Sequence, residues 1–248
     1  MTITSPHNDQ LKEIRKLAGR RWRDKLRQFV AEGEDLLAAA EAAGWEARVR
    51  LVAEGSGLDG EEVRPDLLAG VSALGSGTRV LAVYGQRWAP APVGPLCLAL
   101  WGVNDPGNVG TALRGALAFG AASVALGPGT ADPYGPKAVR ASMGALFEVP
   151  VARVRVAGKL PGRTIALVAR GGAPLHEVVG GDVTLVVGAE REGLPPEVVA
   201  ACDVAGTIAL PRAGRSSPLR SAGDSLNAAM AATVALYEST RNLKGQTL

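Results

Sequence analysis

Hydrophobic and polar residues follow one pattern in the first third of the chain and another pattern in the rest. The segment SPHNDQLKEIRKL spaces Leu11, Ile14 and Leu17 along one face of a helix, with Ser5 or Asn8 as its N-cap. The pattern then predicts strands at 29–33, 46–55 and 78–85, and a helix at 34–44 that ends in glycine. These elements predict a small α/β domain.

A second pattern begins at residue 96, after a segment at 87–95 that contains three prolines and has no periodicity. Near-continuous apolar runs, typical of strands covered on both faces, occur at 96–103, 123–127, 164–170, 183–188 and 206–211. Helices fit between and after them at 107–119, 135–146, 195–201 and 224–241. We therefore predict an α/β protein with domains at 1–86 and 96–248, a linker at 87–95, and a parallel sheet that binds its ligand beyond the carboxyl ends of the strands.

Composition narrows the class of protein. No apolar run is long enough to span a membrane and the N-terminus is polar, so we expect a cytoplasmic protein without a membrane partner. Its two cysteines, Cys97 and Cys202, are too few for a disulfide framework, and the apolar run around Cys97 predicts a buried, inert thiol. Only His7 and His176 could supply imidazole, which argues against a catalytic zinc or a Ser-His-Asp triad; we expect no metal.

Positive charge is concentrated in residues 1–27, which hold eight basic and three acidic side chains although the whole chain carries only +3. A basic block of this kind is typical of proteins that bind RNA or DNA, although a solvated helix face would look the same. The candidate RNA-binding residues are Lys12, Arg15, Lys16, Arg20, Arg21 and Arg23.

The common nucleotide-binding motifs are missing from the sequence. No G-x-G-x-x-G follows a predicted strand, and no G-x-x-x-x-G-K-[ST] occurs. Three other segments stand out at the ends of predicted strands: NDPGNVGTALRG from Asn104, LVVGAEREGL from Leu185, and IALP at 208–211 followed by SLN at 225–227.

Together these segments closely resemble the motifs of the SpoU/TrmH family of RNA 2′-O-methyltransferases, in the SPOUT superfamily. The family pattern is Asn-x-Gly-x-x-x-Arg at a helix start, a strand followed by Gly-x-Glu-x-x-Gly-Leu, and Ile-x-x-Pro followed by Ser-Leu-Asn. All three occur here in that order, and the resemblance covers about residues 96–242. SPHNDQLKEIRKL and FVAEGEDLL separately resemble the family's substrate-binding domain, which is similar to ribosomal proteins of the L30 kind.

This resemblance implies a deep trefoil knot in the second domain, a rare exception to the rule against threaded chains. It also implies that S-adenosylmethionine binds in the knot, and that the protein is a homodimer formed through the knotted domain. The implied cofactor-binding residues are Ala169, Arg170, Gly188, Ile208, Leu210, Ser225 and Leu226. Gly188 has a physical reason of its own, because a residue without a Cβ lets the backbone approach a ligand closely.

The residues implied around methyl transfer are Asn108, Arg114, Glu190, Ser225 and Asn227. A guanidinium rarely gives up its proton, so we assign Arg114 to stabilising the developing 2′-alkoxide and the adjacent phosphate, with Glu190 partly offsetting its charge. Taken singly, Arg114 could be a snorkelling side chain, Asn108 a helix cap and Ser225 the cap of the last helix. The combination favours the functional interpretation.

The sequence therefore predicts an S-adenosylmethionine-dependent RNA 2′-O-methyltransferase that acts on structured RNA, with ribosomal RNA favoured over transfer RNA. The alternatives are a catalytically idle RNA-binding or ribosome-assembly factor, a transfer-RNA ribose methyltransferase and, less in keeping with Ser-Leu-Asn, transfer to a base. The loop at 212–224, longer than the family's usual connection, carries Arg212, Arg215 and Arg220 and either contacts RNA or is a surface excursion. The target nucleotide, and a role in housekeeping or in antibiotic resistance, are not encoded in these motifs.

Overall fold

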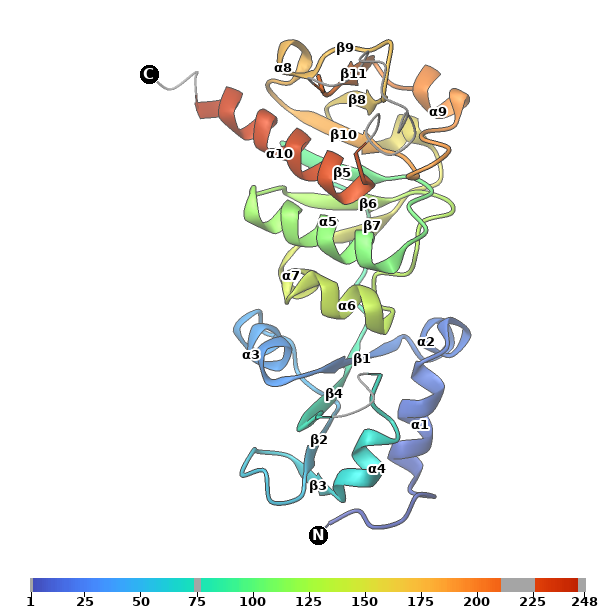
Figure 1. The fold of residues 1–248 in the computed structure, drawn as a ribbon, viewed down its shortest axis with the longest axis vertical. Coiled ribbons are helices and arrows are strands. Elements are labelled where there is room, and N and C mark those ends of the chain that lie inside the picture. Colours follow the sequence, from blue (N-terminus) through green and yellow to red (C-terminus); the bar gives the residue numbers. More distant parts are fainter. Residues whose placement is uncertain (1, 74–76, 211–225, 245–248) are drawn as a thin grey trace, which may run out of the picture.

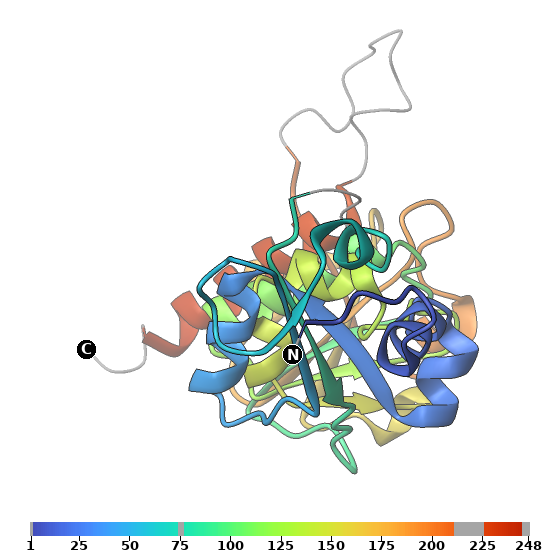
Figure 2. The same ribbon diagram turned by 90° about the horizontal axis from the view of Figure 1, so that it is seen from below.

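A computed structural model describes residues 2–73, 77–210 and 226–244. The chain forms two α/β parts stacked along the long axis of the molecule (Figure 1). Strand β3 (Glu61–Val63) and helix α4 (Pro65–Ala69) lie at the end far from the larger part, and the view from that end shows the smaller part in front of the larger one (Figure 2). No described helix is both long and apolar enough to cross a membrane.

The smaller part is a four-stranded sheet in the order β1-β4-β2-β3. Its remaining elements are α1 (Asp9–Leu17), α2 (Arg20–Leu26), β1 (Gln28–Glu32), α3 (Glu34–Ala42), β2 (Val49–Ala53) and β4 (Val80–Gly85). The predicted stripe of Leu11, Ile14 and Leu17 is buried against one face of this sheet, and the Asn8 side chain caps α1 by accepting from the backbone of Gln10 and Leu11. The predicted α/β arrangement of this part of the chain is present.

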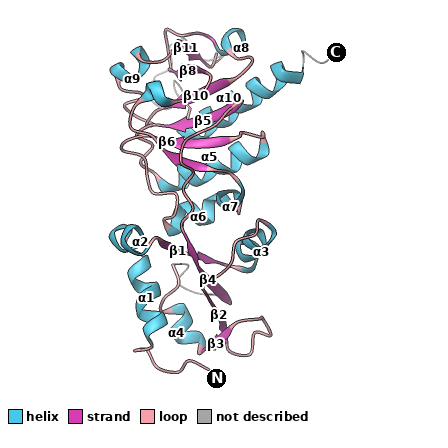
Figure 3. Cartoon of the chain, turned by 180° about the vertical axis from the view of Figure 1, so that it is seen from behind, coloured by secondary structure: helices cyan, strands magenta, loops and turns pink. Residues whose placement is uncertain are grey.

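The larger part is a seven-stranded sheet, parallel throughout, in the order β7-β6-β5-β10-β8-β11-β9 (Figure 3). Its strands are β5 (Leu96–Leu100), β6 (Ser123–Leu126), β7 (Val151–Arg153), β8 (Arg163–Leu167), β9 (Ala173–Pro174), β10 (Val183–Val187) and β11 (Val204–Thr207). Its helices are α5 (Pro106–Ala118), α6 (Pro136–Ser142), α7 (Ala145–Glu148), η1 (Ala157–Lys159), α8 (Leu175–Val178), α9 (Pro196–Ala200) and α10 (Ala228–Lys244). The predicted parallel sheet is confirmed.

Both faces of this sheet are covered, as the continuous apolar runs predicted. Leu98 and Leu100 of β5 face the layer that contains α5 and α10, whereas Cys97 and Ala99 face the layer that contains η1 and α9. Cys97 is buried, and this burial raises the pKa of its thiol, as expected for an inert cysteine. In Figure 1, α5 and α10 lie side by side on one face of the sheet.

Several predicted boundaries were wrong. A second helix, α2, follows α1 after Gly19 and was not predicted, and the helix predicted at 135–146 is broken at Met143 and Gly144, which both adopt left-handed backbone conformations. The strand predicted at 206–211 is β11 and ends at Thr207, while α10 begins at Ala228 instead of 224. Strands β3, β7 and β9 and helices α4, α8 and η1 were not predicted.

Aromatic side chains gather where the two parts meet. The chain has only ten aromatic residues, yet Phe29, Trp45 and Tyr84 of the smaller part contact Tyr134 and Phe147 of the larger part. The Trp45 indole also donates to the backbone carbonyl of Phe147 at 2.8 Å. One hydrophobic core therefore runs through both parts of the molecule.

The segment at 87–95, predicted as a linker, is held along the edge strand of the larger sheet. Ala89 donates its backbone N–H to the carbonyl of Val151 at 2.8 Å and forms a parallel bridge with Ala152. Val93 is bonded at both its N–H and its carbonyl to the hydroxyl of Ser123, at 2.8 and 2.7 Å. These bonds hold the segment against the larger sheet.

A buried ion pair reinforces the junction. The Arg23 guanidinium donates to the Asp132 carboxylate at 2.8 and 2.9 Å, and to the carbonyls of Leu17 and Ala18 at 2.9 and 2.7 Å. Both charged side chains are only 6% exposed. Arg23 thus ties the end of α1 to the larger part, and its burial argues against the RNA contact that we expected of it. The other five candidate RNA-binding side chains are exposed.

Candidate active site

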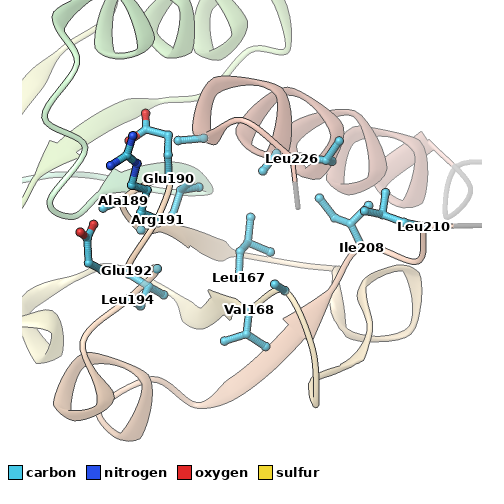
Figure 4. A pocket seen from close by; sticks show the side chains of 16 residues that line it. Leu167, Val168, Ala189, Glu190, Arg191, Glu192, Leu194, Ile208, Leu210 and Leu226 are labelled. Atoms are coloured by element: carbon cyan, nitrogen blue, oxygen red, sulfur yellow. The ribbon is translucent and has the colours of Figure 1, made fainter. Parts of the chain in front are cut away.

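The carboxyl ends of β8, β10 and β11 surround a cavity of about 340 Å³. The three strands are neighbours in the parallel sheet, so the loops that follow them lie at the same edge of the sheet. The start of α10 covers the cavity from above (Figure 4). Leu167, Leu194, Ile208, Leu210 and Leu226 supply an apolar lining, and the Glu190 and Glu192 carboxylates lie at one side. A volume in this range suits a small organic ligand.

Gly188 allows the loop after β10 to fold back on itself. Ala189 and Gly193 exchange backbone hydrogen bonds at 3.0 and 3.1 Å, which closes the loop directly above Gly188. A Cβ at position 188 would lie 2.3 Å from the carbonyl carbon of Gly193 and 2.4 Å from the nitrogen of Leu194. Our reason for this glycine was therefore incomplete, because the backbone that approaches it closely belongs to the same loop.

Three predicted site residues meet at the mouth of this cavity. The Asn227 side chain donates to Oδ1 of Asn108 at 3.0 Å, and Nδ2 of Asn108 donates to Oε1 of Glu190. Asn108 lies in the first turn of α5, Asn227 directly precedes α10, and Glu190 follows β10. Residues far apart in the sequence therefore form one hydrogen-bonded corner.

The direction of these hydrogen bonds is set by a helix cap. Oδ1 of Asn227 accepts from the backbone N–H groups of Ala229 and Met230 at 2.9 and 3.3 Å, so its NH₂ group must point to Asn108. Asn108 accepts that bond with its own oxygen, and this leaves its NH₂ group to donate to Glu190.

The loop before α5 is fixed by its own cap. Asp105 accepts from the backbone N–H groups of Gly107 and Asn108 at 2.6 and 3.2 Å, and its other oxygen pairs with Lys137 at 2.9 Å. The hydrogen bond from Lys137, followed by those from the two backbone groups, holds the pKa of the Asp105 carboxyl below its usual value. Asn108 is thus presented from a rigid turn.

Arg114 lies apart from this corner. It follows Asn108 by six residues, which rotates it about 120° away around the helix, and its side chain is exposed. Within the described residues it forms no ion pair or hydrogen bond, so the expected pairing with Glu190 is not present. It shares the exposed face of α5 with Leu117.

The predicted cofactor-binding residues have different outcomes. Those that line the cavity are Ala169, Gly188, Ile208, Leu210 and Leu226. Arg170 is exposed and is not part of the described lining, while Ser225 and the loop at 212–224 lie outside the described residues. Sequence reasoning missed Leu167, Leu194 and Glu192, because apolar residues and a second glutamate near a strand end carry no specific signal. No group of three or more His, Cys, Asp or Glu side chains that could hold a metal occurs in the described ranges.

Comparison with known families covers nearly the whole chain. The profile of the SpoU rRNA Methylase family matches residues 95–237, and that of the MRM3-like substrate binding domain matches residues 8–90. A Bacillus subtilis relative, the 23S rRNA (guanosine(2553)-2′-O)-methyltransferase RlmP, is 28% identical over 95% of this chain and 97% of its own. A Streptomyces viridochromogenes relative, a 23S rRNA (uridine(2479)-2′-O)-methyltransferase, is 36% identical over 58% of this chain and 52% of its own.

Solved structures agree with this assignment. An AdoMet-bound rRNA methyltransferase from Sinorhizobium meliloti superposes with a TM-score of 0.84 and 28% identity over 98% of both chains. The SpoU methyltransferase AviRb from Streptomyces viridochromogenes, solved with AdoMet, has a TM-score of 0.82 and 27% identity over 96% of this chain and 99% of its own. The motifs, the parallel sheet and the site geometry lead to the same conclusion: the chain belongs to the SpoU rRNA methylase family.

Proposed function

We propose that this protein transfers a methyl group from S-adenosylmethionine to a ribose 2′-hydroxyl of ribosomal RNA. The observation that carries this proposal is the corner formed by Asn108, Glu190 and Asn227 at the mouth of the cavity. The Bacillus subtilis relative is named as a 2′-O-methyltransferase of 23S rRNA and the Sinorhizobium meliloti structure as an rRNA methyltransferase, which favours ribosomal over transfer RNA as the substrate.

The cavity has the features that S-adenosylmethionine requires. Its volume and apolar lining suit an adenosine group, and its walls include backbone from three loops. Glu190 and Glu192 lie at one side with Arg191 between them, which leaves one net negative charge there and favours a cationic ligand. When bound, the cofactor supplies a methyl group on a sulfonium, which needs no metal to react. Ala169, Gly188, Ile208, Leu210 and Leu226 would hold it, together with the leucines that the sequence did not predict.

Within this site, side chains of the protein position the ribose and stabilise the charge that develops during methyl transfer. The 2′-oxygen would accept the methyl group from the bound cofactor, which leaves as the neutral thioether, and the 2′-hydroxyl proton would pass to solvent water. Negative charge would therefore develop on the ribose oxygen during the transfer. We propose that Arg114 stabilises the developing negative charge and contacts the neighbouring phosphate. The Asn108–Glu190 corner holds the ribose in line with the methyl group. The trefoil knot, the cytoplasmic location and the role of Ser225 remain predictions.

The function is tested by two separate measurements. Calorimetry of the purified protein with S-adenosylmethionine tests whether the protein binds this cofactor. Absence of binding would favour the alternative of a catalytically idle RNA-binding factor. Mapping of ribose methylation in a deletion strain tests the reaction and identifies the nucleotide. If the deletion strain lost a methyl group from transfer RNA and none from ribosomal RNA, the substrate would be transfer RNA instead of ribosomal RNA.

Glycine at position 188 provides a specific test of the cavity. We expect Gly188→Ala to weaken S-adenosylmethionine binding about tenfold, because the added methyl group must displace the loop at 189–193. Gly158→Ala is the matched control, since a Cβ there meets nothing within 4 Å and Gly158 does not line the cavity. Equal affinity in both variants, measured by calorimetry, would contradict this account of the loop.

We also propose a homodimer formed through the exposed faces of α5 and α10. Leu117 on α5 and Met230 and Tyr237 on α10 are exposed by 37%, 58% and 47%, although both helices pack against each other and the sheet. A second copy would cover these side chains and place Arg114 at the interface. Because Arg114 lies apart from the corner in its own chain, it would act there at the site of the partner subunit. The concentration of exposed apolar residues on this face favours dimerisation here over other faces of the molecule.

A charge on this face is expected to separate the subunits. Met230→Glu should give a monomeric mass by light scattering at micromolar concentration, because an unpaired carboxylate is costly in an apolar interface. Val93→Glu, which changes a valine exposed by 50% elsewhere on the surface, should keep the dimeric mass. A monomeric mass for the unchanged protein would overturn the dimer.

A further inference from the structure

A second hollow lies between the two parts of the molecule. It measures about 790 Å³ and is bounded by α2, by Trp88, and by the loops that follow β5, β6 and β7. It shares no lining residue with the cavity described above. We call it the junction groove.

The junction groove leads toward the candidate active site. Strands β7, β6, β5 and β10 are consecutive neighbours in a parallel sheet, so the loops after them follow one edge. Asn104 and Pro106, which line the groove, belong to the same turn as Asn108, and Asn108 contacts Glu190 in the cavity lining. A chain lying in the groove would therefore reach the Asn108–Glu190 corner.

The groove carries excess positive charge. Four arginines and one aspartate line it, and the buried pair of Arg23 and Asp132 cancels. Arg20 and Arg153 share one exposed carboxylate, Asp24, at 3.7 and 3.3 Å. Arg155 is exposed and has no ion pair among the described residues. The charge pattern favours a polyanion.

An aromatic platform lies in the same place. The Arg153 guanidinium is stacked 4.0 Å above the Trp88 ring, and the Arg153 side chain is 49% exposed. Trp88 is held in turn by the edge of Tyr134, with ring centroids 5.1 Å apart, and by donation of its indole N–H to Gln86 at 3.2 Å. The outer face of a guanidinium that is fixed in this way can stack a nucleobase.

We propose that the junction groove binds the single-stranded RNA segment next to the target nucleotide. A base stacks on Arg153, while Arg20 and Arg155 contact the phosphates on either side of it. This inference rests on the proposed function for its ligand class. The platform favours RNA over an acidic protein segment, which has charge but no bases to stack.

The test is a fluorescence-anisotropy titration of the full-length protein with a short fluorescein-labelled oligoadenosine over a range of salt concentrations. Arg155→Ala should lower the slope of log affinity against log salt by about 0.7, the amount expected for one lost phosphate contact on a single strand. Arg153→Lys should keep the slope but weaken binding about tenfold, since lysine retains the charge and loses the planar surface. Lys159→Ala, which removes a charge four residues beyond Arg155 and outside the groove lining, should change neither quantity.

Arg155 is exposed and unpaired among the described residues, so its variant should fold normally. Unchanged slope in Arg155→Ala and unchanged affinity in Arg153→Lys would overturn the proposal, as would an equal loss in Lys159→Ala. The proposal would also be overturned if the protein bound no RNA but bound an acidic peptide, with an affinity that depends on the charge of Arg155 and not on stacking at Trp88 and Arg153. S-adenosylmethionine affinity is measured on the same variants: if the unchanged protein binds no cofactor, the proposed function fails while the RNA titration still decides the groove.

Discussion

Arg114→Lys is expected to reduce the rate of methyl transfer by about 10²–10³-fold, the loss typical of removing one donor to a developing oxyanion. The charge is kept, but a point-like ammonium cannot contact an alkoxide and a phosphate at once as the planar guanidinium can. Within the described residues Arg114 makes no hydrogen bond or ion pair, so its replacement should leave the fold intact.

The measurement is single-turnover methylation of ribosomal RNA, with S-adenosylmethionine affinity determined in parallel. Affinity for the cofactor should be unchanged, because Arg114 does not line the described cavity. Arg79→Lys, an exposed arginine that pairs with Glu34 in the smaller part, is the matched control and should retain the full rate. Near-normal turnover in Arg114→Lys would show that the Arg114 guanidinium does not stabilise the transition state of methyl transfer.

Arg23→Ala is expected to lower the free energy of unfolding by about 3–5 kcal/mol, because it leaves the buried Asp132 carboxylate without its counter-charge. The carbonyls of Leu17 and Ala18 also lose their hydrogen-bond donor. Urea denaturation of the full chain measures the effect. Arg64→Ala, which breaks an exposed pair with Asp66, should leave stability nearly unchanged. Similar midpoints for the two variants would show that the junction does not depend on Arg23.

The sequence predicted the parallel sheet well because each central strand carries its own signal. Strands such as β5 and β10 are covered on both faces and read as unbroken apolar runs, whatever lies around them. The edge strands β7 and β9 have only three and two residues, too few for any period to show. The break after α6 depends on a distant contact, since a Cβ on Gly144 would lie 2.6 Å from the Cβ of Ala39.

Motifs could predict three residues that meet at the candidate site, but not their geometry. Asn108, Glu190 and Asn227 belong to recognisable motifs, and the structure brings them together. The direction of their hydrogen bonds follows from the cap on α10, which no motif specifies. Arg23 looked like its exposed neighbours because its partner, Asp132, lies 109 positions away in the sequence. Trp88 stood in a proline-rich segment, where one aromatic residue forms no pattern.

The packed aromatic junction has a consequence for how a nucleotide is chosen. Because one core joins both parts, and Arg23 ties the end of α1 to Asp132 of the larger part, the exposed basic side chains of α1 are held at a constant offset from Asn108. We therefore expect that, if these side chains bind a feature of the folded RNA, the modified ribose is the one that lies at this fixed distance from it. Inserting one nucleotide between that feature and the target should move the methyl group to the neighbouring residue or abolish it, whatever the identity of the base.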